Sequence, residues 1–364
     1  MEKKIINNPV INLSDYGFNI LQIESYAACN MECSFCPYPL KDDKESKLSI
    51  DDITKVIDQI NPNDTGFDYI TFSQFNEPLL DNRIFDLISY AQNKGLKVLL
   101  ITNGLLLNKK KNIENLFKYK PILKISLQVV DQNTHAKARG LNLELEKYSK
   151  TIFDFCKLAN KECKDLNISI DVGCSYNESK ITFLSKKLMG LQTGDPSVAI
   201  NKNSLFKNLE LLVKDLSEIN KDYFANQNMN FKDSKFNIDY RKQTGFNITK
   251  NIKLKIKPFF YGRRMKDFKP IPSDIFTCGN QILGILADGS VLPCCLAYDD
   301  SISLGNIKKV NLYNILNNNI FLKDLRDING NKHITCRKCF GEPTKRGVVF
   351  REIKFKLQNL FKST

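Results

Sequence analysis

Short apolar runs alternate with helical segments along the first half of the chain. Runs that predict strands lie at residues 18–26, 68–73, 97–102, 121–127 and 167–174. Segments with helical periodicity lie between them, at residues 50–60, 83–95, 108–118 and 142–160. Strands that alternate with helices predict a parallel sheet with helical crossovers, and strands this rich in apolar residues are typical of buried parallel sheets. The pattern therefore predicts an α/β fold.

The pattern changes after residue 175. Residues 176–250 contain a helical segment near 204–224 within polar sequence rich in Asn and Lys, and we interpret this region as an insertion or lid. Residues 252–260 predict one more strand. Farther on, the apolar runs ILGIL and SVLPC are joined by Ala-Asp-Gly-Ser, which is a hairpin signal. This arrangement predicts a small second module after the sheet.

Residues 346–364 have the pattern of a basic amphipathic helix. Its apolar positions share one helical face, and they are Val349, Phe350, Ile353, Leu357, Leu360 and Phe361. Such a helix either packs on its own domain or lies on a membrane surface. We expect it to pack, because packing is the more common arrangement.

The composition narrows the class of protein. With 364 residues, of which 42% are hydrophobic, the chain is long enough for one large domain and a small one. No run approaches the roughly 20 apolar residues that span a bilayer. Residues 1–17 lack the features of a secretory signal, which predicts a cytoplasmic protein with a short N-terminal extension.

The formal net charge is +14. A charge of this sign fits an acidic partner, such as a phosphorylated or nucleotide-linked substrate, nucleic acid or an anionic membrane. The lysines are dispersed along the chain, however, so the charge equally describes a solvated Lys-rich surface, which we favour.

The eleven cysteines carry more information than the charge. A reducing cytosol disfavours disulfides, and an odd number of thiols cannot all pair. The chain has only two histidines, His135 and His333, so thiolate ligands for zinc or iron–sulfur clusters are favoured over an imidazole site. Three cysteines, at positions 156, 163 and 174, match no ligand spacing.

Cys29, Cys33 and Cys36 follow the first predicted strand in one short loop. A structural zinc site or a closed cubane needs four ligands, whereas this loop offers three. An iron without a protein thiolate is an open coordination site, as a catalytic metal centre requires. The loop therefore predicts a catalytic cluster rather than three incidental thiols.

A C-x-x-x-C-x-x-C loop after the first strand of a β/α chain resembles the radical S-adenosylmethionine (SAM) superfamily. The resemblance implies a partial (β/α)6 TIM-like barrel over residues 18–275 and a [4Fe–4S] cluster held by the three cysteines. It also implies that SAM chelates the fourth iron and that one electron cleaves SAM to a 5′-deoxyadenosyl radical. The cofactors supply this chemistry, and the protein positions them.

Further motifs match the family in order. Asn76-Glu77-Pro78 follows the second strand, where relatives usually have Gly-Glu-Pro, so Asn76 is a departure. By the resemblance, Glu77 accepts from the amino group of SAM, for which a carboxylate is a suitable partner. The resemblance also places Asn103 near the cofactor, Ser126 on its ribose and Arg139 on its carboxylate.

The second module contains Cys278, Cys294, Cys336 and Cys339, enough thiolates to ligate one cluster or one zinc fully. Cys295 competes with Cys294, because only one of two adjacent strand residues points at a site. The module resembles the SPASM/twitch domain of many radical SAM enzymes. That resemblance implies a small α+β domain at residues 276–345 with an auxiliary [4Fe–4S] cluster, and a structural zinc ribbon is the alternative.

The resemblance implies a radical oxidoreductase that abstracts hydrogen from a small polar substrate, such as a sugar or aminosugar. The auxiliary cluster would assist the oxidation, and an electron donor such as flavodoxin or ferredoxin would act as partner. A maturase of a ribosomal peptide or protein is the alternative, although the short segment before the first strand leaves little room for a peptide-binding domain. A zinc scaffold or nucleic-acid binder is disfavoured, because base-stacking aromatics and clustered arginines do not stand out.

Overall fold

The structure of the protein is a computed structural model that describes residues 9–128, 131–174, 208, 214–216, 219, 244–258, 268–275, 280–298, 302–318 and 333–360. The chain divides into two compact units. Unit 1 consists of Met1–Cys29, Leu40–Ile101 and Cys278–Asn331, and unit 2 consists of Asn30–Pro39, Thr102–Thr277 and Lys332–Thr364. Each unit therefore combines segments that are distant in the sequence.

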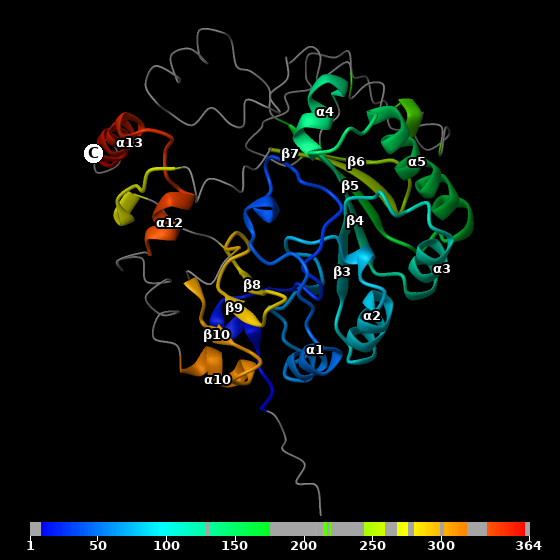
Figure 1. Cartoon of the computed structure of the whole chain (residues 1–364), viewed down its shortest axis with the longest axis horizontal. Coiled ribbons are helices and arrows are strands. Elements are labelled where there is room, and N and C mark those ends of the chain that lie inside the picture. The colour runs from blue at the N-terminus through cyan, green and yellow to red at the C-terminus, as the bar shows by residue number, and fades with distance from the viewer. Residues whose placement is uncertain are drawn as a thin grey trace, which may run out of the picture. The chain divides into compact units, whose positions relative to one another are not determined.

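Unit 1 is built on strands in the order β10-β9-β8-β1-β2-β3 (Figure 1). The strands are β1 (Ile20–Ile23), β2 (Tyr69–Thr71), β3 (Val98–Thr102), β8 (Ile282–Ile285), β9 (Ser290–Leu292) and β10 (Gly305–Asn306). The first three and β8 are parallel, whereas β9 and β10 are antiparallel additions. Its helices are α1 (Ile50–Ile57), α2 (Ile84–Asn93) and α10 (Leu312–Asn317), with 3-10 turns at Leu13–Tyr16 and Pro78–Leu80.

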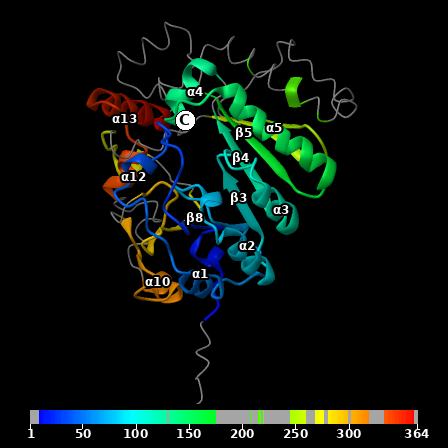
Figure 2. The same ribbon diagram turned by 45° about the vertical axis from the view of Figure 1, so that its right-hand side comes forward.

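Unit 2 contains the strand order β4-β5-β7-β6. Its strands are β4 (Ile122–Gln128), β5 (Ile168–Cys174), β6 (Thr244–Asn247) and β7 (Ile252–Pro258), of which β6 is antiparallel. Its helices are α3 (Lys110–Tyr119), α4 (Gln132–Arg139), α5 (Leu145–Glu162), α12 (Ile334–Cys339) and α13 (Lys345–Leu360), with a 3-10 turn at Ser273–Ile275. Figure 2 shows β4 and β5 side by side, with α5 running along them. A further 3-10 turn, Tyr38–Leu40, ends the cysteine loop.

The α/β class and the parallel sheet are confirmed. Every strand and helix predicted before residue 175 is present, with ends that differ by a few residues. The predicted hairpin of ILGIL and SVLPC is the antiparallel pair β8 and β9. Most of the predicted insertion at 176–250, including most of the helix near 204–224, lies outside the described residues. The sequence analysis missed β6, because four residues containing Thr, Gly and Asn show no alternation.

Some helix ends follow from local chemistry. Ser49 accepts a hydrogen bond from the backbone N–H of Asp52 and so caps the first turn of α1. Asp131 caps α4 in the same way, through the backbone N–H of Thr134. Gly95, at φ +82°, follows α2 and allows the chain to turn into β3. These signals are local, and the sequence predicted α1 and α2, whereas α4 was not among the predicted helices.

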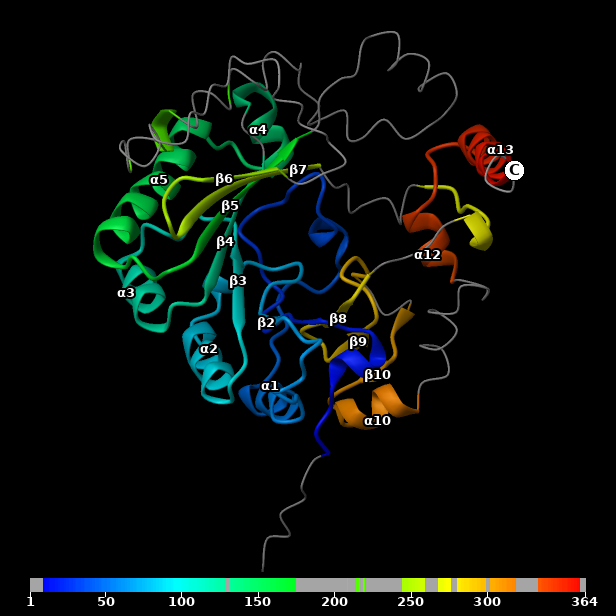
Figure 3. The same cartoon turned by 180° about the vertical axis from the view of Figure 1, so that it is seen from behind.

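The predicted helix at the C-terminal end of the sequence is α13, which packs beside α12 in unit 2 (Figure 3). It packs through Val348 and Phe355 on the cluster of Ile271 and Ile275, against which Phe340 also packs. The apolar face that the sequence singled out is exposed instead, and its described members are Val349, Phe350, Ile353 and Leu357. The expectation that the helix packs is confirmed, but the predicted face was the wrong one for that contact.

Candidate functional site

The cysteine loop leaves unit 1 after Cys29 and passes through residues 30–39 of unit 2. Cys33 is buried, whereas Cys29 and Cys36 are half-buried, and all three thiols are free of disulfides. The backbone N–H of Cys36 donates to the carbonyl of Cys33 at 3.0 Å, and that of Tyr38 approaches the Cys36 sulfur at 3.4 Å. The loop is therefore tightly turned around its second and third cysteines.

Within unit 2, this loop is docked on the C-terminal end of α4. The backbone N–H groups of Glu32 and Ser34 donate to the carbonyls of Arg139 and Ala138, at 3.2 Å and 2.8 Å. Gly140 ends the helix at φ +70°, and a Cβ there would lie 2.3 Å from the Glu32 carbonyl oxygen. Glycine is needed for both reasons, so the Ala-Arg-Gly sequence fixes the approach of the loop.

Arg139 is 2% exposed and connects the predicted site residues of unit 2. Its guanidinium donates to the Cys33 sulfur at 3.5 Å, to the carbonyl of Ser126 and to the hydroxyl of Tyr148. The Tyr148 hydroxyl in turn donates to the carbonyl of Asn103. Burial acts to lower the pKa of Arg139, but Tyr148 and Cys33 hold it above its ordinary value. A permanent cation therefore lies beside a predicted cluster ligand.

The side chains of Asn103 and Ser126 have their own partners. The Asn103 amide donates to the Asn30 side chain in the cysteine loop at 2.6 Å. Ser126 accepts from Gln128 at 2.7 Å, at a register shift where Gln128 adopts φ +60°. A left-handed residue other than glycine at a strand end is costly, and such strain is common at functional sites. The carboxyl end of β4 is thus an irregular, polar edge.

Glu77 lies in unit 1, where it is 1% exposed. Its backbone N–H donates to the carbonyl of Ala28 at 2.9 Å, so it is held beside the residue that precedes Cys29. The departure at Asn76 has a structural reason. The Asn76 side chain accepts from the backbone N–H of Gln74 at 2.9 Å and donates to the Phe72 carbonyl at 3.1 Å, so it closes the turn itself.

The two faces of the unit 1 sheet differ in polarity. One face is apolar and 0% exposed, and it consists of Leu21, Ile23, Ile70, Phe72, Leu283 and Ile285. The register places Gln22, Thr71 and Gly284 side by side on the other face. The Gln74 carboxamide covers Gly284, where a Cβ would lie 2.8 Å from its nitrogen. Both polar atoms of Gln74 and the Gln22 side-chain oxygen are buried without a hydrogen-bond partner among the described residues.

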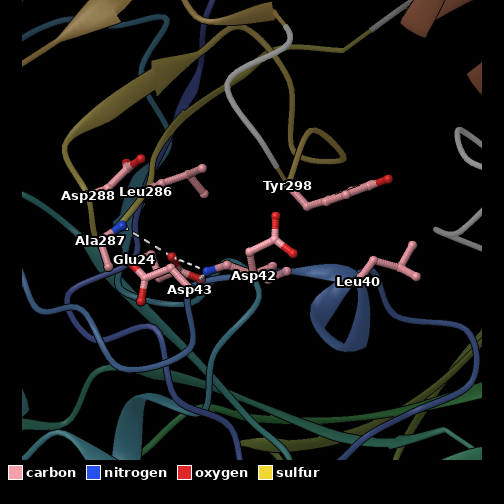
Figure 4. Close-up of a pocket in the computed structure, with 9 residues that line it drawn as sticks. Glu24, Leu40, Asp42, Asp43, Leu286, Ala287, Asp288 and Tyr298 are labelled. Atoms are coloured by element: carbon pink, nitrogen blue, oxygen red, sulfur yellow. Dashed lines mark hydrogen bonds and ion pairs between the residues drawn. The ribbon is translucent and has the colours of Figure 1, made fainter.

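A cavity of about 210 Å³ lies in unit 1, and Glu24, Lys41 and Asp288 line it (Figure 4). Lys41 Nζ lies 2.6 Å from both carboxylate oxygens of Glu24, and the Ala287 backbone N–H donates to Glu24 at 3.1 Å. Burial raises the pKa of Glu24, and Lys41 opposes the rise. This pair ties the end of β1 to the segment that follows the cysteine loop and to the β8–β9 turn.

The cysteines of the second module are only partly described. Cys294 accepts a hydrogen bond from the backbone N–H of Leu296 at 3.2 Å. Hydrogen bonds from Cys295 and from the backbone N–H groups of Leu296 and Ala297 lower the pKa of Cys294 to about 7, although burial opposes them. The Cys295 sulfur also lies 3.4 Å from the Asn280 side-chain oxygen. Backbone N–H groups that converge on a sulfur stabilise a thiolate, which distinguishes Cys294 from its neighbour.

Cys336 and Cys339 lie on α12 in unit 2, three residues apart and both half-buried. Cys278 lies outside the described residues. Among the residues that the structure describes, no three Cys, His, Asp or Glu side chains are gathered as a metal site. The predicted ligands belong to segments of different units, so neither unit contains a complete set.

Comparisons with known proteins agree with the cysteine pattern. A model of the radical SAM superfamily matches residues 23–183, and a model of the SPASM iron–sulfur cluster-binding domain matches residues 277–340. The chain carries a radical SAM domain followed by a SPASM domain. This radical SAM protein therefore works with [4Fe–4S] clusters and SAM as cofactors. No curated protein matches it.

Solved structures share the fold of this radical SAM protein. SuiB of Streptococcus suis bound to S-adenosylmethionine matches with a TM-score of 0.50 and 16% identity, over 86% of this chain and 70% of that one. SuiB bound to the precursor peptide SuiA matches with a TM-score of 0.50 and 15% identity, over 91% of this chain and 72% of that one. BtrN in complex with AdoMet and 2-DOIA matches with a TM-score of 0.43 and 14% identity, over 85% of this chain and 86% of that one. At such identities the likeness to SuiB establishes the fold, a partial barrel with a C-terminal domain.

The donor set fits the cofactors. The radical SAM loop offers three thiols that are not in disulfides and a buried cation beside Cys33, and Glu77 provides a buried carboxylate in unit 1. Sequence reasoning missed Tyr148, Gln22, Gln74 and the Glu24–Lys41 pair. Tyr148 looks like any residue on the buried face of a helix, and no motif marks the others. In the described part of the chain, no helix has the length and apolar content needed to cross a membrane.

The Glu24–Lys41 pair gives a stability prediction. We expect Lys41→Met to lower the free energy of unfolding by about 3–5 kcal/mol at neutral pH, because it leaves the Glu24 carboxylate buried and unpaired. The double variant Glu24→Gln, Lys41→Met should recover most of this loss. Urea unfolding of the anaerobic protein measures both. An equal loss in the double variant would contradict the assignment.

The stability of the Lys41→Met variant should depend on pH. The folded-state pKa of Glu24 lies above its ordinary value of 4.5, and loss of Lys41 removes the group that opposes this rise. The folded protein then binds the proton more tightly than the unfolded chain does, so stability increases as pH falls through the raised pKa towards 4.5. We expect Lys41→Met to regain stability between neutral pH and about 5, whereas the double variant should not.

Arg139 gives a second prediction. We expect Arg139→Gln to weaken retention of the loop cluster by about 10- to 100-fold, as the loss of residues that support metal ligands does elsewhere. Iron content during chelator challenge and the EPR spectrum of the reduced protein measure this effect, with thermal unfolding as a check on folding. Arg139→Lys keeps the charge and should lose less. Wild-type iron retention and spectrum in Arg139→Gln would refute the role.

Proposed function

We propose that Cys29, Cys33 and Cys36 hold a [4Fe–4S] cluster with one open iron, and that the enzyme oxidises a small polar substrate such as a sugar or aminosugar. When bound, the cluster and SAM supply the 5′-deoxyadenosyl radical that abstracts hydrogen. Glu77, Asn103, Ser126 and Arg139 are the proposed cofactor-positioning residues. Arg139 would position the cofactor through Cys33 rather than by its own contact, because its guanidinium donates to Cys33, to the Ser126 carbonyl and to Tyr148.

The polar face of the unit 1 sheet is the observation that supports this substrate class. Gln22 and Gln74 bring uncharged donors and acceptors to that face, and their buried polar atoms lack partners among the described residues. A buried carboxamide without a hydrogen bond costs about 1–3 kcal/mol. A ligand with hydroxyl or amine groups would satisfy these atoms. Uncharged carboxamides suit hydroxyl groups better than they suit a phosphate. This face therefore favours an unphosphorylated substrate over the phosphorylated ones that the net charge allowed.

The second module supports an oxidative reaction. We propose that Cys278, Cys294, Cys336 and Cys339 ligate an auxiliary [4Fe–4S] cluster. A two-electron oxidation of the substrate removes one hydrogen atom, one proton and one further electron. A fully ligated cluster has no site for substrate but accepts an electron, so it suits the last of these. A flavodoxin or ferredoxin is the proposed reductant for the loop cluster.

Modification of a peptide is the second candidate. SuiB has been solved with a precursor peptide, so the shared fold accommodates such a ligand in that protein. The two candidates differ in which compounds stimulate the cleavage of SAM. Stimulation of 5′-deoxyadenosine release by sugar alcohols or aminosugars supports the first candidate, whereas stimulation by short peptides alone supports the second.

The central claim is tested with reconstituted protein, SAM and dithionite under anaerobic conditions. We expect the wild type to release 5′-deoxyadenosine and Cys33→Ala to release none above the protein-free control, because the loop then lacks a ligand. Cys163→Ala is the matched control, since Cys163 is also buried but lies outside the loop. Chromatography of the products measures both. Release by Cys33→Ala at the wild-type rate would sink the proposal.

The auxiliary site is tested by a pair of adjacent cysteines. We expect Cys294→Ala to reduce the iron content from about eight to about four per chain, as loss of one of two cubanes requires. Cys295→Ala should keep both clusters, because the backbone N–H groups of the turn converge on Cys294. If the wild type contained zinc and only about four irons per chain, the second module would be a structural zinc ribbon instead.

A further inference from the structure

The helix α13 presents apolar side chains to solvent. Val349 is 56% exposed, Phe350 39%, Ile353 52% and Leu357 49%. They are spaced at i, i+1, i+4 and i+8, so they form one strip along the helix. Four large apolar side chains exposed together on one helix are unusual, and contiguous patches of this kind mark interaction sites.

The strip is not the surface that holds the helix on the protein. The opposite side of α13 packs through Val348 and Phe355 on Ile271 and Ile275 of the same unit. Arg351 fastens this side, since its guanidinium donates to the Phe340 carbonyl at 2.6 Å and to Glu342 at 3.1 Å. Helix α13 therefore has two apolar sides, of which only one is covered.

Basic residues flank the exposed strip. Lys345, Arg346, Lys354 and Lys356 are exposed. The helical period places Arg346 one turn before Val349, Lys354 one turn after Phe350 and Lys356 beside Ile353. Glu352 is the only acidic residue between positions 345 and 360, and it pairs with Lys356 at 3.0 Å. The strip is thus an apolar line with positive charge along both sides.

We propose that the exposed strip of α13 binds the surface of an anionic lipid bilayer. The apolar side chains would enter the boundary between headgroups and acyl chains, and the lysines would extend to the phosphates with their stems over the apolar surface. Clustered Lys and Arg on an amphipathic helix are typical of this mode. A convex strip edged by positive charge matches a negatively charged plane better than an uncharged groove. Attachment of this kind is reversible, because the strip is short and the charge contribution is screened by salt.

The proposal does not depend on the reaction, so vesicle binding tests it separately. Full-length anaerobic protein is sedimented with phosphatidylcholine vesicles that contain phosphatidylglycerol, and with phosphatidylcholine vesicles alone. We expect at least about tenfold stronger partition onto the anionic vesicles, weakened by added salt. Ile353→Glu should abolish partition, and Lys354→Glu with Lys356→Glu should reduce it about tenfold or more.

Val310→Glu is the matched control, because Val310 is a 45% exposed apolar residue in unit 1. It should bind as the wild type does, and all variants should keep the wild-type iron content and circular dichroism. Absence of partition onto anionic vesicles, or equal losses in Val310→Glu, would overturn the proposal. A dimer that Ile353→Glu dissociates, without vesicle binding, would assign the strip to a second copy of the chain instead.

Discussion

The contact between the cysteine loop and the end of α4 determines how the candidate site is built. Arg139 is fully enclosed, yet it stays charged because Tyr148 and Cys33 surround its guanidinium. A buried cation is costly unless its donors are engaged, and both terminal nitrogens of this guanidinium donate hydrogen bonds, whereas its buried Nε has no partner among the described residues. Its contacts with the Cys33 sulfur, the Ser126 carbonyl and the Tyr148 hydroxyl therefore constrain the loop, β4 and α5 together. Gly140 permits this arrangement, since a larger residue would collide with the Glu32 carbonyl.

The ends of the loop depend on a buried ion pair. Glu24 follows β1, and Lys41 follows the cysteines, so their contact in unit 1 brings together the segments on either side of the loop. Ala287 of the β8–β9 turn contributes a hydrogen bond to the same carboxylate. A pair of this kind adds little net stability compared with apolar packing, but it penalises alternative arrangements of the segments it joins. It thus specifies where the loop begins and ends.

The sheet of unit 1 separates stability from function by face. The face with Leu21, Ile70 and Leu283 is wholly apolar and carries the core. The other face carries carboxamides that find no partner among the described residues, which a fold selected only for stability would avoid. The same separation recurs on α13, where one side packs and the other stays exposed. In both cases the unpaired surface is where a ligand or partner is expected.

The sequence alone determined most strands and helices before residue 175, the α/β class and the type of chemistry. These depend on hydrophobic periodicity and on the spacing of three thiols, both of which act over a few residues. Only the tertiary structure decided that Arg139 contacts Cys33, that Asn76 closes its turn with its side chain, and that Val348 and Phe355 form the packed side of α13. Those outcomes depend on segments far apart in the chain, such as residues 32 and 140 or 271 and 355, whose approach no local pattern encodes.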